Sequence, residues 1–278
     1  MMVQQLEQGT VSAPAVLSVA GIGRTYTTKN RPPKEAIREI SFEARLGELV
    51  CVVGPSGAGK TTLLRCLAGL LQPSRGTIAF EGRRVEGTPP EVAVVFQDYS
   101  RSLFPWLTVA SNIALPLKNK GMDKQERARL VEESLSAVGL PDVASYHPWQ
   151  LSGGMQQRVA IARALAYQPK LLLMDEPFAS VDAQTRFELE DLVLAVRERF
   201  GMTIVFVTHD IDEAVYVGDR IVVLSSSPCV VLRDLTVPFG AARDQVTTRR
   251  DPRFGDLRGE VLELVMRRPD ASLRPPRS

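Results

Sequence analysis

The sequence predicts an α/β fold in which helices cover a largely parallel sheet. Two short, unbroken apolar runs, Leu49–Val53 and Leu171–Met174, are typical of parallel strands that are buried on both faces. Amphipathic stretches with helical spacing alternate with such runs, and the longest extends from Asp182 to Phe200. A chain of 278 residues can bury a full core as one large domain or two small ones.

The N-terminal third of the chain alternates expected strands with turns. Residues 1–15 are polar, and we expect their backbone to fray. A turn is expected at Lys29–Lys34, because two successive prolines exclude regular structure there. A helix is expected behind Leu49–Val53, on the apolar stripe Leu63, Leu64, Leu67 and Leu70. The other runs of strand length are Val16–Val19, Ala36–Phe42, Thr77–Phe80 and Val92–Phe96.

After Phe96 the pattern becomes helical. Asp123 and Glu126 resemble the start of a capping box, and Gly139 ends the helix that follows. A second helix follows Ser152 and continues to Ala166, so residues 98–166 predict a helical insertion in the α/β core. The remaining expected elements are the helices Asp182–Phe200, Asp210–Val217 and Leu257–Met266 and the strands Leu171–Met174, Thr203–Val207 and Ile221–Leu224.

Composition limits the class of partner. A net charge of +2 is too balanced for a nucleic-acid groove, so we expect no nucleic-acid partner. Cys51 and Cys66 lie in apolar patterns and are expected to be buried thiols, which is typical of a cytosolic protein. No run approaches the ~18 apolar residues of a membrane span, and the N-terminus shows no secretion signal. We therefore expect a soluble protein whose role at a membrane would be peripheral.

The most informative motif is a phosphate-binding loop between an expected strand and an expected helix. It matches the pattern G-x-x-x-x-G-K-[ST] and comprises Gly54, Pro55, Ser56, Gly57, Ala58, Gly59, Lys60, Thr61 and Thr62. Such a loop points backbone N–H groups and the positive end of the helix dipole at an anion. Lys60 is expected to reach the β- and γ-phosphates, and the Thr61 hydroxyl to bind Mg²⁺. The loop predicts a nucleotide-hydrolysing protein.

Two adjacent carboxylates, Asp175 and Glu176, follow the expected strand Leu171–Met174. Ligands bind at the carboxyl ends of strands in open α/β sheets. Asp175 suits the binding of Mg²⁺, and Glu176 suits the polarisation of an attacking water. The alternative is an ordinary helix cap, which the phosphate loop upstream disfavours.

A second pattern suited to anions lies at Ser152, Gly153 and Gly154, at the start of an expected helix. It can meet the phosphates at residues 54–62 only if the chain folds back. One alternative is that it serves a nucleotide held by a second copy of the protein. The other is that Ser152 is an ordinary helix cap.

The order of these motifs resembles that of the nucleotide-binding subunit of an ABC (ATP-binding cassette) transporter. The similar pattern extends over about residues 16–235 and consists of the phosphate loop, Gln97, Leu151–Met155, Leu171–Pro177, Ser180–Asp182 and Thr208–Asp210. Segments 96–98, 103–109, 212–215, 249–254 and 257–261 are similar to the branch that imports nitrate, sulfonates and taurine. Met155 and Val181 depart from the wider family, which often has Gln and Leu at these positions. The neighbouring residues Ser152 and Asp182 still match the family pattern.

The resemblance implies a P-loop NTPase fold, with a RecA-like core, an antiparallel β subdomain and a helical subdomain. The implied division is a flexible N-terminus at 1–15, an ATP-binding core with the β subdomain at 16–97 and 167–239, a helical signature subdomain at 98–166, and a C-terminal extension at 240–278. ATP and Mg²⁺ are the implied cofactors, with Thr61, Gln97 and Asp175 at the metal.

The resemblance also implies roles for individual residues. Tyr26 would stack on adenine, although a core or rim tyrosine is the alternative. Gln97 would touch Mg²⁺ and the attacking water, and His209 would bond the γ-phosphate beside Glu176. His147 has no such context, and we interpret it as structural. In a head-to-tail dimer, the opposite subunit would contribute Ser152, Gly153 and Gly154 to the γ-phosphate, with Asp182 at the dimer seam.

The function implied is the ATP-hydrolysing motor of an importer for nitrate, sulfonates, taurine or a related small organic anion. The implied partners are a second copy in an ATP-sandwich dimer, integral-membrane permease subunits and, indirectly, an extracytoplasmic solute-binding protein. The protein would lie peripherally on the cytoplasmic side of the cell membrane. A soluble ABC-type ATPase and an exporter motor are the alternatives. Leu103, Phe104, Trp106 and Leu107 would form a groove for the permease, or would pack the insertion's own core.

Overall fold

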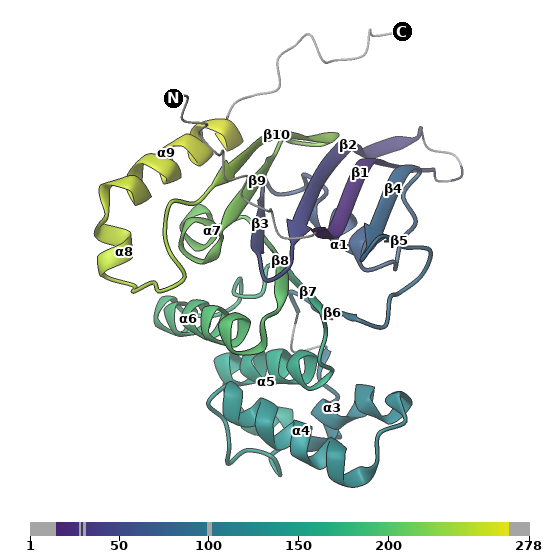
Figure 1. Cartoon of the computed structure of the whole chain (residues 1–278), viewed down its shortest axis with the longest axis vertical. Coiled ribbons are helices and arrows are strands. Elements are labelled where there is room, and N and C mark those ends of the chain that lie inside the picture. The colour runs from purple at the N-terminus through teal and green to yellow at the C-terminus, as the bar shows by residue number, and fades with distance from the viewer. Residues whose placement is uncertain (1–14, 28, 30–31, 99–101, 267–278) are drawn as a thin grey trace, which may run out of the picture.

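Ten strands form one continuous sheet in the computed structural model, which describes residues 15–27, 29, 32–98 and 102–266 (Figure 1). The strand order is β5-β4-β1-β2-β10-β9-β3-β8-β7-β6. The strands are β1 (Ala15–Tyr26), β2 (Lys34–Arg45), β3 (Leu49–Val53), β4 (Arg75–Phe80), β5 (Arg83–Arg84), β6 (Val92–Val95), β7 (Leu171–Asp175), β8 (Thr203–Thr208), β9 (Arg220–Leu224) and β10 (Cys229–Thr236).

One half of the sheet is parallel. β6 pairs with β7, β7 with β8, β8 with β3 and β3 with β9, all in parallel register. Every residue of β3, β7 and β8 is buried, because helices cover both faces of these central strands. This confirms the expectation drawn from the unbroken apolar runs.

The other half is antiparallel and consists of β1, β2, β4 and β5. β10 joins the halves, since it runs parallel to β2 and antiparallel to β9. The prediction that the first strand ends at Val19 is wrong. A bulge at Gly21, with φ +58°, shifts the register between Val19 and Ile22 and lets β1 continue to Tyr26.

The helices are α1 (Lys60–Leu67), α3 (Val109–Ala114), α4 (Lys124–Ala137), α5 (Gly153–Ala166), α6 (Ala183–Phe200), α7 (Ile211–Val217), α8 (Thr247–Arg250) and α9 (Pro252–Met266), with 3₁₀ turns η1 (Leu115–Lys120) and η2 (Pro148–Gln150). Two of them, α4 and α5, begin at caps that the sequence suggests, Asp123 and Ser152. The side chains of Asp123, Ser152 and Asp182 accept bonds from the backbone N–H groups three residues on. Gly201 ends α6 with φ +60°.

Several predicted bounds are wrong. α1 ends at Leu67, so Leu70 lies beyond it and is 54% exposed. The last helix begins at Pro252 rather than Leu257, because proline is accommodated in the first turn of a helix. β5, α3 and β10 were not predicted. Of the expected turn at 29–34, residues 30 and 31 lie outside the described residues, as do residues 1–14.

Figure 1 shows the helical insertion as a separate layer below the sheet, formed by α3, α4 and α5, while α8 and α9 lie beside α7 at the opposite end. One apolar core joins the insertion, α6, α7 and α9 to one face of the sheet. A second core joins α1 and the antiparallel strands to the other face of the parallel strands. The three cysteines are buried and free, as expected for Cys51 and Cys66.

In the part of the chain that the structure describes, the helices are too short or too polar to cross a membrane.

Candidate nucleotide-binding and catalytic site

The predicted phosphate loop connects β3 to α1. Gly57 and Gly59 have φ values of +76° and +103°, a region that residues with a Cβ rarely adopt. A Cβ on Gly59 would lie 3.1 Å from the carbonyl oxygen of Ala36, whereas a Cβ on Gly57 would meet nothing within 4 Å. The space before Gly57 is therefore open, which suits close approach of an anion to the backbone.

Lys60 is held under this loop as a buried cation. Its Nζ donates to the carbonyl oxygens of Gly54 at 2.8 Å and Pro55 at 3.2 Å. It also lies 3.4 Å from Oε1 of Glu176. The side chain is 5% exposed, so its charge is balanced mainly by these three partners. A phosphate entering the loop would meet a positive charge that is already in place.

Asp175 and Thr61 offer oxygens to a hard cation. The Thr61 hydroxyl donates to Oδ1 of Asp175 at 3.4 Å. Burial raises the pKa of Asp175, and the bond from Thr61 opposes this. A cation beside the pair would favour the charged carboxylate. No group of three or more His, Cys, Asp or Glu residues suited to a metal occurs among the described residues.

Glu176 is the centre of the site. Its Oε2 accepts a bond from Nε2 of Gln97 at 3.3 Å and lies 3.0 Å from Nδ1 of His209. With Lys60 at Oε1, three side chains from separate segments converge on one carboxylate. Glu176 has φ +44°, which is strained for a residue with a Cβ. The structure thus brings together Lys60, Gln97, Glu176 and His209, which the sequence places far apart.

A hollow of about 360 Å³ lies next to this cluster, within the size range of small-molecule sites. Its lining comprises Tyr26, Lys34, Ala36, Ser56, Gly57, Gly59, Lys60, Thr61, Thr62, Glu176 and Ser227. The Tyr26 hydroxyl is 3.1 Å from Oγ1 of Thr62, and the guanidinium of Arg24 lies 5.0 Å from the centre of the ring. Tyr26 therefore stands at the wall of the hollow, where a base could stack on it.

Ser152, Gly153 and Gly154 are not among the residues that line this hollow. Ser152 caps α5, with its Oγ accepting from the backbone N–H of Met155 at 3.3 Å, and both Ser152 and Gly153 are exposed. A Cβ on Gly154 would lie 2.5 Å from Cγ2 of Thr185, the residue whose N–H and hydroxyl bond Asp182. The glycine therefore lets α5 approach the start of α6.

Sequence reasoning missed the support beneath His209. The Thr208 hydroxyl donates to Oε2 of Glu213 at 2.6 Å, and Arg186 bonds Oδ2 of Asp210 at 2.8 Å. Burial raises the pKa of Glu213 to about 7, and the bond from Thr208 opposes the shift. The one signal that could have indicated these contacts was the position of Glu213 on the buried face of α7.

The family profile described as ABC transporter matches residues 37–179, from β2 to just beyond Glu176. The chain belongs to the ABC transporter family. It is 40% identical over 250 residues to the nitrate import ATP-binding protein NrtD of Synechococcus elongatus, which covers 89% of this chain and 90% of that protein. It is 37% identical over 252 residues to the taurine import ATP-binding protein TauB of Roseobacter denitrificans, covering 90% and 93%.

This ABC cassette also matches part of a longer relative. It is 44% identical over 233 residues to the nitrate import ATP-binding protein NrtC of Synechococcus elongatus, covering 83% of the cassette but 35% of that protein. Among solved structures, it resembles the ATP-binding cassette MJ0796 in a dimeric post-hydrolysis state bound to ADP and Pi. The TM-score is 0.70 at 32% identity, over 81% of this chain and 100% of that one. The predicted fold class is confirmed, and the cassette is an ATP-binding ATPase.

Proposed function

We propose that this cassette is the ATP-hydrolysing motor subunit of an importer for nitrate, a sulfonate, taurine or a related small organic anion. ATP hydrolysis is supported by one observation, the convergence of Lys60, Gln97 and His209 on the Glu176 carboxylate. The import part is supported by the similarity, over nine-tenths of their lengths, to NrtD and TauB.

We assign the ATP-binding core to residues 16–97 and 167–239, the helical signature subdomain to 98–166 and the C-terminal extension to 240–278. The adenine would stack on Tyr26 at the wall of the hollow. The phosphates would lie in the loop 54–62, where Lys60 meets the β- and γ-phosphates.

Thr61, Asp175 and Gln97 would hold Mg²⁺, and the Thr61 hydroxyl already bonds Asp175. The ion would neutralise charge that develops on the phosphates during transfer. Glu176 orients the attacking water and takes its proton. Its carboxylate is held in position by contacts on both oxygens. Nδ1 of His209 lies 3.0 Å from Oε2 of that carboxylate, and His209 would donate a hydrogen bond to the γ-phosphate.

The second half of each site would come from another copy of the chain. Ser152 and Gly153 are exposed at the N-terminus of α5, a helix end that favours an anion, and they lie outside the hollow of their own chain. In a head-to-tail dimer they would close on the γ-phosphate, with Asp182 at the seam. Hydrolysis removes that shared ligand, so the dimer opens.

The permease would dock on the helical insertion. Phe104 and Trp106 are 37% and 71% exposed and their ring centres lie 5.3 Å apart, which favours a contact surface. Leu103 is 2% exposed, so it packs the core of the insertion instead. The cassette would thus lie on the cytoplasmic side of the membrane. A solute-binding protein would deliver the anion to the permease without touching the cassette.

Replacing Glu176 by Gln tests the catalytic assignment. The amide keeps the size of the side chain but cannot accept the proton of the water, so ATP binding should persist while turnover falls by about 100-fold. ATPase rate and nucleotide affinity would be measured on the same preparation. Glu188→Gln is the control, because Glu188 is an exposed carboxylate of α6 that pairs with Arg158. Full ATPase activity of E176Q would contradict the assignment.

A further inference from the structure

The C-terminal segment, residues 240–266, is joined to α6 through a buried carboxylate. Glu190 of α6 is fully buried. Its Oε2 accepts bonds from Nη2 of Arg249 at 2.7 Å and from Nε2 of Gln245 at 3.0 Å. Both partners belong to the C-terminal segment. Since an unpaired buried charge is strongly unfavourable, Glu190 ties this segment to the cassette.

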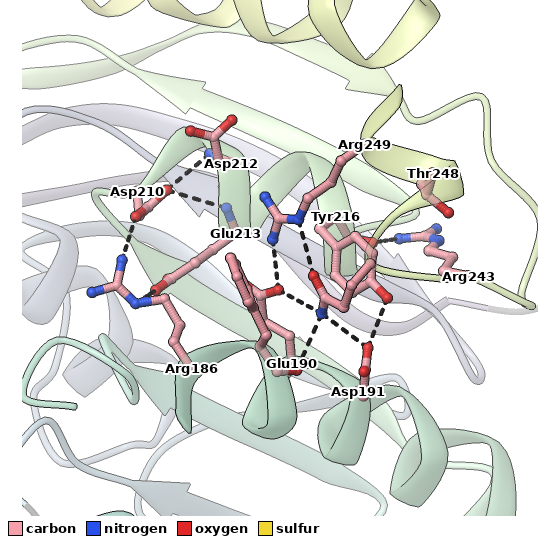
Figure 2. A network of polar contacts seen from close by, with 12 residues as sticks. Arg186, Glu190, Asp191, Asp210, Asp212, Glu213, Tyr216, Arg243, Thr248 and Arg249 are labelled. Carbon is pink, nitrogen blue, oxygen red and sulfur yellow. Dashed lines mark hydrogen bonds and ion pairs between the residues drawn. The ribbon is translucent and has the colours of Figure 1, made fainter. Parts of the chain in front are cut away.

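Arg249 contacts three elements at once. Its guanidinium lies 4.9 Å from the ring centres of Phe187 on α6 and Tyr216 on α7, and 5.5 Å from that of Phe254 on α9. Cations are attracted to the faces of aromatic rings, more strongly when water is excluded. Figure 2 shows Arg249 above Glu190 and beside Tyr216. Arg249 therefore fixes α7 relative to α6.

Other contacts hold α7 at both ends. Arg258 of α9 lies 2.8 Å from Oδ1 of Asp212 in the first turn of α7. At the last turn, Arg243 donates to the carbonyl oxygen of Tyr216. The Tyr216 hydroxyl donates to Oδ1 of Asp191 on α6 at 2.7 Å. The C-terminal segment thus sets where α7 lies on the cassette.

The position of α7 in turn sets the position of His209. Asp210, the next residue, caps α7 by accepting from the N–H groups of Asp212 and Glu213 at 2.9 and 3.2 Å. Thr208, the residue before, donates to Glu213 of α7 at 2.6 Å. Both neighbours of His209 are therefore bonded to the first turn of α7 (Figure 2 shows the Asp210 cap).

We propose that the C-terminal segment positions His209 for ATP hydrolysis and that Arg249 is the positioning residue that docks it on α6 and α7. Arg249 acts through α7 and has no contact with the nucleotide hollow. The inference rests on the proposed role of His209. It assigns the C-terminal segment to the hydrolysis step of the cassette, separate from nucleotide binding.

Arg249→Met tests this, because methionine keeps an unbranched apolar stem and removes the guanidinium. The chain has two histidines, His147 and His209, so histidine-selective isotope labelling gives two imidazole signals in the NMR spectrum, assigned with His147→Gln. We expect R249M to move the His209 signal and leave that of His147 in place. We also expect kcat to fall by about 10- to 100-fold, as displaced catalytic groups do, with ATP affinity unchanged.

Arg253→Met is the matched control. Arg253 is on the same segment, but it pairs with the nearby Asp251 and lies over Phe239, so both imidazole signals and kcat should stay as they are. If R249M does not fold, the double variant E190Q/R249M removes the unpaired buried charge and is measured in the same way.

The inference is overturned if R249M leaves the His209 signal and kcat unchanged. It is also overturned if kcat and ATP affinity fall together, or if R253M reproduces the loss, because a general loss of stability then explains the result. His209→Ala separates this inference from the proposed function. Full ATPase activity of H209A would contradict the role of His209 itself, whereas an inactive H209A with an unaffected R249M would contradict the positioning role alone.

Discussion

Replacing Glu213 by Gln should change the pH dependence of folding stability in a calculable way. Glu213 is 4% exposed, and burial raises the pKa of its carboxyl from 4.5 to about 7. Between these two pH values the Glu213 carboxyl is ionised in the unfolded chain but keeps its proton in the folded chain. The folded state therefore loses stability as pH rises through this window. Gln has the same shape and no ionisation, so E213Q lacks this loss.

The magnitude follows from the two pKa values. The full difference corresponds to about 3.4 kcal/mol, since one pKa unit is 1.36 kcal/mol, and about 2.5 kcal/mol of it falls between pH 5 and pH 8. Urea unfolding of wild type and E213Q at these two pH values measures it, because the other titrating groups cancel in the difference. The free energy of unfolding of E213Q relative to wild type should rise by about 2.5 kcal/mol from pH 5 to pH 8. A difference that does not change with pH would refute the burial of an ionisable Glu213.

Two further predictions concern the start of α5. Ser152→Arg should bind ATP normally but form no ATP-dependent dimer in light scattering, because the arginine would block the surface that we propose for the contact with the second copy. An ATP-dependent dimer would contradict the shared site. Gly154→Ala should lower the free energy of unfolding by about 1–3 kcal/mol, because its Cβ would lie 2.5 Å from Cγ2 of Thr185. Thr185→Ser removes that methyl group, so the urea midpoint of G154A/T185S should recover; a midpoint as low as that of G154A would contradict the steric explanation.

The parts of the site that are contiguous in sequence could be predicted from the sequence. The phosphate loop, the Asp175–Glu176 pair and the caps at Asp123 and Ser152 each depend on neighbours within a few residues. The bounds of β1 could not be predicted, because the bulge at Gly21 hides the continuation of the strand. β10 was not predicted because most of its residues are half-buried or exposed, so the strand lacks an apolar run.

The contacts around the site that the sequence could not predict join residues that are distant in sequence. Glu190 and Arg249 lie 59 residues apart, and Arg186 and Asp210 lie 24 apart. Nothing in the local pattern of α6 indicates that Glu190 is buried, since acidic residues on amphipathic helices usually face solvent. The partners of Glu190 are supplied only when the C-terminal segment docks on α6 and α7.

The central claim is that this cassette drives a membrane permease through ATP. The most direct measurement is affinity purification of tagged E176Q with ATP and Mg²⁺ from gently solubilised membranes of its host, with mass spectrometry of the eluate. Trp106→Ala in the same background tests the docking surface. The account predicts that a multi-span permease elutes with E176Q in comparable amounts. It also predicts that this permease is absent from the eluate when Trp106→Ala is added to E176Q. Recovery of E176Q as a soluble dimer without any membrane protein would contradict the transport role and leave the ATPase.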